Sequence, residues 1–79
     1  MPPRTSVPTT LQVPLDSSCL RSVGYSVDAA AMEVTFRNGS LYRYFDVPEF
    51  LHGGFMVARS KGASFNTRID ARFRHEEVR

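Results

Sequence analysis

Hydrophobic and polar residues alternate along three stretches in the first two thirds of the chain. A period of two places every second side chain on the same face, which is the pattern of a half-buried β-strand. The segments 28–31 (Asp-Ala-Ala-Ala) and 37–39 (Arg-Asn-Gly) separate these stretches as turns, and Asn-Gly is a strong hairpin signal. The pattern therefore predicts a three-stranded antiparallel meander. Its strands are residues 19–27, 32–36 and 41–45.

Apolar residues change to a helical spacing after the third strand. Pro48 and Glu49 suit the first turn of a helix, because proline lacks the N–H that would be unpaired there and a carboxylate favours the helix N-terminus. A second helix is predicted over residues 63–73, after a break at 59–62. Strands followed by helices are typical of the α+β class, so we expect the two helices to pack on one face of the meander. The first helix would bury Phe50, Leu51, Phe55 and Ala58, and the second Phe65, Ile69 and Phe73.

The two ends of the chain differ in composition from this middle. Residues 1–16 are rich in Pro, Thr and Ser and predict an extended or disordered arm, followed by a domain over residues 17–74. Leu11, Val13 and Leu15 alternate, so part of the arm has the pattern of a strand, which Pro14 would confine to a sheet edge. Residues 75–79 are predicted to fray.

The loop of the second hairpin decides which way Tyr42 and Tyr44 point. A two-residue loop would place Arg43 among apolar residues and both tyrosines outside. A three-residue loop with Gly39 in the left-handed position would pair Val34 with Tyr42, Met32 with Tyr44 and Glu33 with Arg43. We favour the three-residue loop, because a slip by one residue reverses both faces and only this register separates charged from apolar residues.

In the favoured register the tyrosine rings build the core, and the other face of the sheet carries Leu41, Arg43 and Phe45. An exposed surface of this kind suggests an interface with a protein partner or a second copy of the chain. The alternative is that the N-terminal arm folds back over this face.

Length and composition exclude several classes of protein. With 79 residues the chain is one domain at most, and its single cysteine, Cys19, cannot form an internal disulfide. Cys19 lies far in sequence from both histidines, so we expect no zinc site and no cofactor, and a reducing cytoplasm suits this cysteine usage. No apolar run is long enough to span a membrane, and the proline-rich N-terminus does not have the pattern of a signal peptide.

Seven short motifs occur in order along residues 17–73. They are Ser17-Ser18, Gly24-Tyr25, Phe36-Arg37-Asn38-Gly39, Tyr42-Arg43-Tyr44, Val47-Pro48, Ser60-Lys61-Gly62 and Phe65-Asn66-Thr67-Arg68-Ile69. Through these motifs residues 17–73 resemble the KTSC domain, a short module named after its place at the C-terminus of some lysyl-tRNA synthetases, which also occurs alone in bacteria and phages. The resemblance suggests RNA binding.

Positive charge gathers late in the chain, although the net charge is only +2. Between residues 59 and 74 the only acidic residue is Asp70. These basic residues would contact RNA phosphates, and Tyr42 and Tyr44 would stack on bases only in the disfavoured register. The alternative is a solvated helix face on which Arg68 or Arg72 pairs with Asp70 or with a carboxylate of the sheet face. The basic residues are Arg59, Lys61, Arg68, Arg72 and Arg74.

We do not expect an enzyme, because the acidic residues are scattered over turns and strand ends and His52 is best explained as a surface residue. The first hypothesis is a small non-catalytic module that binds RNA through the C-terminal helix. The second is a protein-interaction or self-association module that uses the open sheet face. A third, a hydrolase-like activity, has no residues to carry it. Neither of the first two involves a membrane.

Overall fold

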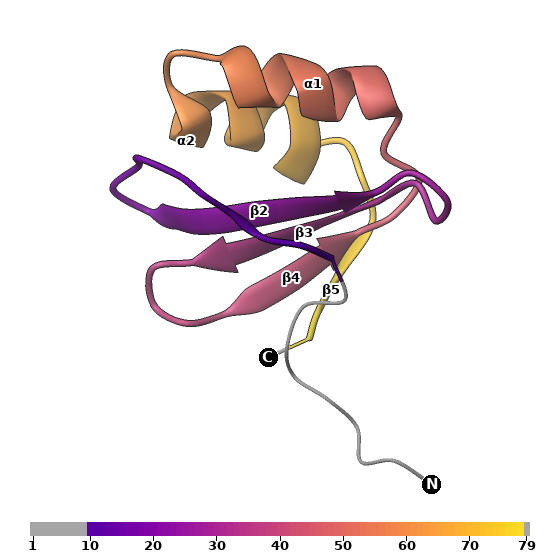
Figure 1. The fold of residues 1–79 in the computed structure, drawn as a ribbon, viewed down its shortest axis with the longest axis horizontal. Coiled ribbons are helices and arrows are strands. Elements are labelled where there is room, and N and C mark those ends of the chain that lie inside the picture. The colour runs from indigo at the N-terminus through magenta and orange to yellow at the C-terminus, as the bar shows by residue number, and fades with distance from the viewer. Residues whose placement is uncertain (1–9, 79) are drawn as a thin grey trace, which may run out of the picture.

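A computed structural model describes residues 10–78, and the fold belongs to the α+β class. Its antiparallel sheet has the strand order β1-β2-β3-β4-β5, and the helices lie together above one face of that sheet (Figure 1). The strands are β1 (Val13–Pro14), β2 (Leu20–Ser26), β3 (Ala31–Phe36), β4 (Leu41–Tyr44) and β5 (His75–Glu77). The helices are α1 (Glu49–Val57), α2 (Lys61–Ser64) and the π-helical segment η1 (Phe65–Asp70).

The favoured register of the β3–β4 hairpin is confirmed. Glu33 lies opposite Arg43, Val34 opposite Tyr42 and Met32 opposite Tyr44. The N–H of Phe36 donates to the carbonyl of Ser40 at 2.8 Å, which closes a loop of residues 37–39. Gly39 has a φ of +96°, a backbone conformation that glycine adopts without steric cost. The bulged glycine therefore fixes which side chains of β4 face the helices.

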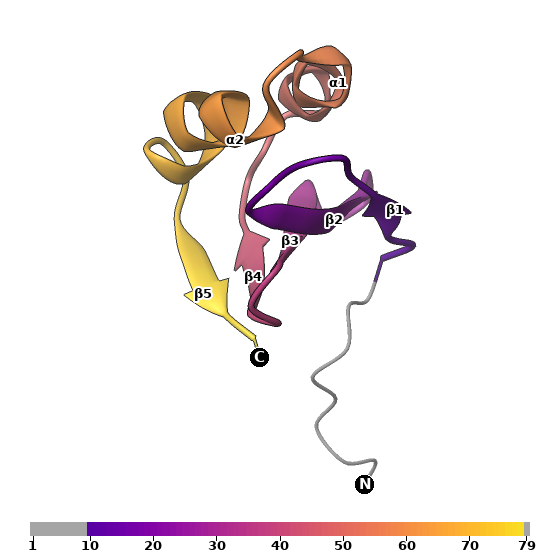
Figure 2. The ribbon, with the colours of Figure 1, turned by 90° about the vertical axis from the view of Figure 1, so that its left-hand side faces the viewer.

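The core lies between the sheet and the helices. Met32, Val34 and Tyr44 point from the sheet into this layer, where Phe55 of α1 and Ile69 of η1 meet them, all fully or almost fully buried. Figure 2 shows the C-terminal helical segment above β4 and β5, and α1 above β2. The other buried apolar members of the core are Leu15, Leu20, Val23, Val47 and Phe65.

The prediction of three strands is wrong in number, because each end of the described chain adds a further strand. Val13 and Pro14 pair with β2, and His75–Glu77 pair with β4. Residues 75–78 are thus part of the sheet and do not fray. Of the predicted arm, residues 1–9 lie outside the described residues, as does Arg79 at the other end, whereas residues 10–15 run along the sheet with Pro14 in an edge strand, as proline requires.

The second helix is shorter than predicted and changes its pitch. It begins at Lys61, where the side chain of Ser60 caps it by accepting from the N–H of Ala63, and it ends at Asp70 rather than at residue 73. The hydroxyl of Thr67 donates to the carbonyl of Ala63 at 3.0 Å, which competes with the α-helical bond to that carbonyl. The N–H of Ala71 consequently reaches back five residues to the carbonyl of Asn66.

The first helix also departs from the expectation in detail. Pro48 is the residue before the helix rather than its first residue, and Phe50 is 74% exposed instead of part of the core. Phe55 is buried and Leu51 is half-buried against the core, as predicted.

Candidate functional site

The sheet face away from the helices holds a buried ion pair. The side chain of Glu33 is fully buried, and Arg43 donates to its Oε2 from Nη2 at 2.7 Å and from Nε at 3.0 Å. Thr10 donates to Glu33 Oε1 from its N–H and its hydroxyl, at 2.9 and 2.7 Å. Arg43, the middle residue of the Tyr-Arg-Tyr motif, is therefore a structural residue that ties β3 and β4 to the N-terminal segment.

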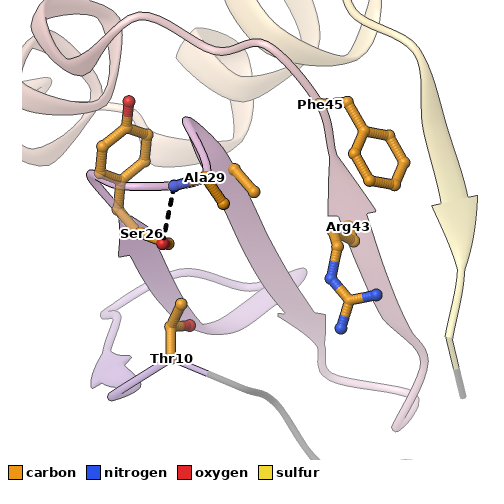
Figure 3. A pocket seen from close by; sticks show the side chains of 7 residues that line it. Thr10, Ser26, Ala29, Arg43 and Phe45 are labelled. Atoms are coloured by element: carbon orange, nitrogen blue, oxygen red, sulfur yellow. Dashed lines mark hydrogen bonds between the residues drawn. The ribbon is translucent and has the colours of Figure 1, made fainter.

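This face is less open than the second hypothesis requires. Leu41 is fully buried, so its predicted place on an exposed interface is wrong. The N-terminal segment covers part of the face with Thr10 and Gln12, while Leu11 itself points to solvent at 89% exposure. What remains is a hollow of about 350 Å³. Figure 3 shows Thr10 and Ser26 on one side of this hollow and Arg43 and Phe45 on the other.

The two tyrosines of the motif have different environments on the helix-facing side. Tyr44 is 1% exposed, packs edge-on against Phe65 and donates from its hydroxyl to Asp70 Oδ1 at 2.7 Å. Burial, together with the bond to the Asp70 carboxylate, raises the pKa of Tyr44 far above its usual value, so it stays neutral. Tyr44 cannot stack on a base. Tyr42 is only half-buried and lies nearer the hairpin loop.

A groove of about 400 Å³ opens beside Tyr42, between β3, β4 and η1. We call it the Tyr42 groove. The ring of Tyr42 meets Phe36 edge-on, with ring centroids 5.4 Å apart, and lies 5.5 Å from the ring of His75. The other residues that line it are Asn38, Ser40, Tyr44, Phe65, Asn66 and Asp70.

Several polar groups that line the Tyr42 groove have no hydrogen-bond partner within residues 10–78. Among them are the hydroxyls of Tyr42 and Ser40, the side-chain amide of Asn66 and the Nδ2 amino group of Asn38, whose Oδ1 accepts from the N–H of Ser40. The exposed carboxylate of Asp70 accepts from Tyr44 at Oδ1, and no donor within residues 10–78 bonds its Oδ2. The groove thus presents both donors and acceptors around aromatic rings.

The predicted basic residues lie in the break before α2, on the helical segment and in the turn after it. Arg59, Arg68, Arg72 and Arg74 are exposed, and Lys61 is half-buried, with Nζ donating to the carbonyl of Ala58. Both ion pairs found in residues 10–78 belong to Arg43, which bonds Glu33 and Glu76. The expected pairing of Arg68 or Arg72 with Asp70 is absent from this part of the chain.

The basic residues do not form one compact patch. Arg59 and Lys61 line a polar hollow of about 280 Å³ together with Ser17 and Ser18. Arg68 lies on η1, between Asn66 and Asp70 in sequence, and does not line the Tyr42 groove. Arg74 lies with its guanidinium 5.0 Å from the ring centre of Phe45. Arg72 follows η1 in the turn before β5.

His52, which sequence reasoning set aside, stacks on Tyr25. The two rings are 4.7 Å apart and almost parallel, at 12°. Burial lowers the pKa of His52, and the nearby carboxylate of Glu49 opposes that shift. Tyr25 donates from its hydroxyl to the carbonyl of Val47, so this stack supports the connection into α1.

Asn38, Asp70 and His75 line the groove but were not predicted from the sequence as site residues. They come from three separate parts of the chain. The only sequence signals near them were the Phe36-Asn38 and Phe65-Asn66 motifs. Over residues 10–78 no cluster of His, Cys, Asp and Glu is arranged to hold a metal ion. No helix in that range has the length and apolar character needed to cross a bilayer.

Comparisons with known proteins agree with one another. The KTSC domain profile matches residues 16–73. An uncharacterized protein of Stutzerimonas stutzeri is 44% identical over 55 residues, which cover 70% of this chain and 78% of that protein. The crystal structure of a KTSC domain protein from Yersinia pestis superposes with a TM-score of 0.82 at 37% identity, covering 87% of this chain and 97% of that one.

A lysine–tRNA ligase of Nostoc punctiforme is 30% identical over 63 residues. These cover 80% of this chain but only 11% of the ligase, so the similarity concerns one small part of that enzyme.

Proposed function

The chain belongs to the KTSC domain family, and from this premise we propose that it is a small non-catalytic module that binds single-stranded RNA. The observation that carries the proposal is the set of basic residues between positions 59 and 74, none of which has an ion-pair partner within residues 10–78. An arginine that is already paired would have to exchange one partner for another, whereas Arg59, Arg68 and Arg72 are exposed and available to phosphates.

The role of Asp70 strengthens this interpretation. It is the one carboxylate in the basic stretch, and it accepts a hydrogen bond from Tyr44 instead of pairing with Arg68 or Arg72. Within residues 10–78, Asp70 therefore does not neutralise Arg68 or Arg72 by an ion pair. The segment similar to this chain in a lysine–tRNA ligase is consistent with an RNA context. The single cysteine, an exposed free thiol, suits the reducing cytoplasm in which such a module would work.

The test is the salt dependence of binding to a short single-stranded oligoribonucleotide, followed by fluorescence anisotropy. Each phosphate contact contributes a slope of ~0.7 to the fall of log K with log salt for single strands. We expect Arg68→Ala and Arg72→Ala each to weaken binding severalfold and to reduce the slope by about that amount. Arg21→Ala is the matched control, because Arg21 is also exposed but lies on β2.

Equal losses of binding affinity in all three variants would indicate a nonspecific response to net charge. Binding that does not change with salt, or no binding at low salt, would contradict the proposal.

One observation favours the second candidate, a protein-interaction or self-association module. The hollow beside Arg43 and Phe45 leaves part of the sheet face uncovered. A sizing experiment with light scattering over a range of protein concentrations tests self-association, and Phe45→Ala should then lower the mass observed. A constant monomer mass would remove the self-association form of this hypothesis.

A further inference from the structure

We infer that the Tyr42 groove holds one unpaired nucleobase of the bound strand. This inference rests on the proposed function and adds to it a place where a base, rather than a phosphate, is bound. The groove volume of about 400 Å³ lies within the range of ~300–1,000 Å³ that small-molecule sites occupy.

The aromatic side of the groove is held in place before a ligand arrives. The ring of Tyr42 is in edge-on contact with Phe36. The ring of His75, on β5, lies near it as well, with the Tyr42 and His75 ring centroids 5.5 Å apart. Tyr42 remains half-exposed and His75 exposed, so both rings are accessible from solvent. A base that stacks on a fixed ring loses less entropy than one that must first order it, and base–aromatic stacking is the main sequence-tolerant term in single-strand binding.

The polar side of the groove matches the edge of a base. The amide of Asn66 can both donate and accept, Asn38 Nδ2 donates, and Asp70 Oδ2 accepts. Single-stranded RNA is recognised in this way, by stacking combined with hydrogen bonds to the Watson–Crick edge. The groups belong to the hairpin loop and to η1, so the base would lie between the sheet and the helical segment.

The charge of the residues that line the groove favours a neutral base over a phosphate inside it. The only formally charged residue lining the groove, with histidine counted as neutral, is Asp70, whose carboxylate would repel a phosphate. Arg68 lies on the same helical segment, between Asn66 and Asp70, and is exposed. A nucleotide bound here would therefore place its neutral base in the groove and leave its phosphate outside, in solvent.

The experiment compares a single-stranded oligoribonucleotide with a strand of equal length that carries abasic positions. We expect the complete strand to bind at least about fivefold more tightly to the wild-type protein, because base stacking contributes only to the binding of the complete strand.

Asn66→Ala should reduce the ratio of the affinities for the complete and abasic strands. It should leave the salt slope unchanged, since Asn66 carries no charge. Val57→Ala is the control, because Val57 is 84% exposed at the end of α1 and does not line the groove. The side-chain amide signal of Asn66 should shift when the complete strand is added and stay unchanged with the abasic strand.

The outcomes distinguish the two claims. Equal affinity for the complete and abasic strands, with normal salt dependence, would overturn the groove inference and leave the proposed RNA binding intact. Asn66→Ala with an unaltered ratio would overturn it as well. Failure of both strands to bind at low salt would overturn the proposed function and the groove inference together. Circular dichroism and thermal unfolding of each variant show whether its fold is retained.

Discussion

At the scale of single residues, Arg43 illustrates how position rather than residue type determines a role. It lies between two tyrosines and carries a full charge, which are features of an RNA contact. In the structure it is directed to the opposite face, where it neutralises the buried carboxylate of Glu33. Gly24 belongs to the same arrangement, since a Cβ at that position would lie 2.0 Å from Thr10 Oγ1, and Thr10 is the other donor to Glu33.

Arg43→Met should destabilise the protein by ~3 kcal/mol, because it removes the guanidinium that makes two hydrogen bonds to the buried carboxylate of Glu33. Arg43 is 23% exposed, so water will take up part of that loss. The double variant Glu33→Gln/Arg43→Met should recover most of the stability, since both charges are then gone. Urea unfolding of the two single variants and the double variant measures the coupling. Additive losses would show that the pair contributes little.

His52 makes the stability depend on pH. Burial lowers its pKa in the folded state, so the folded protein binds this proton less tightly than the unfolded chain does. Its contribution is complete above the unfolded pKa near 6.5 and is lost as the pH falls through the lower folded value. Wild type should therefore lose stability relative to His52→Phe between about pH 7 and 5. Phenylalanine keeps a ring on Tyr25 but cannot titrate. A constant difference in the free energy of unfolding across this range would contradict the expectation.

At the scale of elements, the long periodic segments were predictable and the short ones were not. The Asn38-Gly39 turn and the pairing of Glu33 with Arg43 determined the β3–β4 register, which the structure confirms. The alternation at Leu11, Val13 and Leu15 indicated an edge strand where β1 lies, but did not enter the count of three strands, and β5 has only three residues, too few for periodicity to show. Their pairing depends on the strands beside them, which local sequence does not encode.

The candidate site was predictable only in part, for the same reason. The basic residues are evident in sequence because they are close together, and they are exposed as expected, apart from Lys61. The Tyr42 groove is formed by the 36–42 hairpin, η1 and His75, which only the folded chain brings together. The change to π-helical pitch was also not predictable, because residues 65, 69 and 73 fit an ordinary α-helix.

The glycine pair in α1 should limit its stability. Gly53 and Gly54 are exposed, and an added Cβ at either position meets no atom within 4 Å. We expect Gly53→Ala and Gly54→Ala each to stabilise the protein by ~1 kcal/mol, because alanine loses less backbone entropy in a helix. For a domain of this size that corresponds to a rise in Tm of about 4–8 °C, measurable by thermal unfolding. A lower Tm would show that the helix requires glycine here.

At the scale of the whole molecule, the outer strands lie beyond the part that matches the family. The KTSC domain profile covers residues 16–73, whereas β1 lies at residues 13–14 and β5 at 75–77. The three strands predicted from the sequence are the three inside that match. The flanking residues extend the sheet on both sides, and β5 also brings His75 to the tyrosines and Glu76 to Arg43.

A chain that ends at Arg74 should therefore keep the fold but lose stability and the edge of the candidate site. It loses the bond from the N–H of Val78 to the carbonyl of Leu41 and the β4–β5 pairing, which should cost ~1 kcal/mol for each hydrogen bond removed. Tyr42 would lose one of its two ring neighbours. A chain that ends at Val78 is the control, since it keeps β5. Urea unfolding measures the stability of each chain. The ratio of the affinities for the complete and abasic strands shows whether each chain keeps a working groove. If both chains were equally stable and equally selective, β5 would be an accessory to the sheet, and the Tyr42 groove would have to be formed without His75.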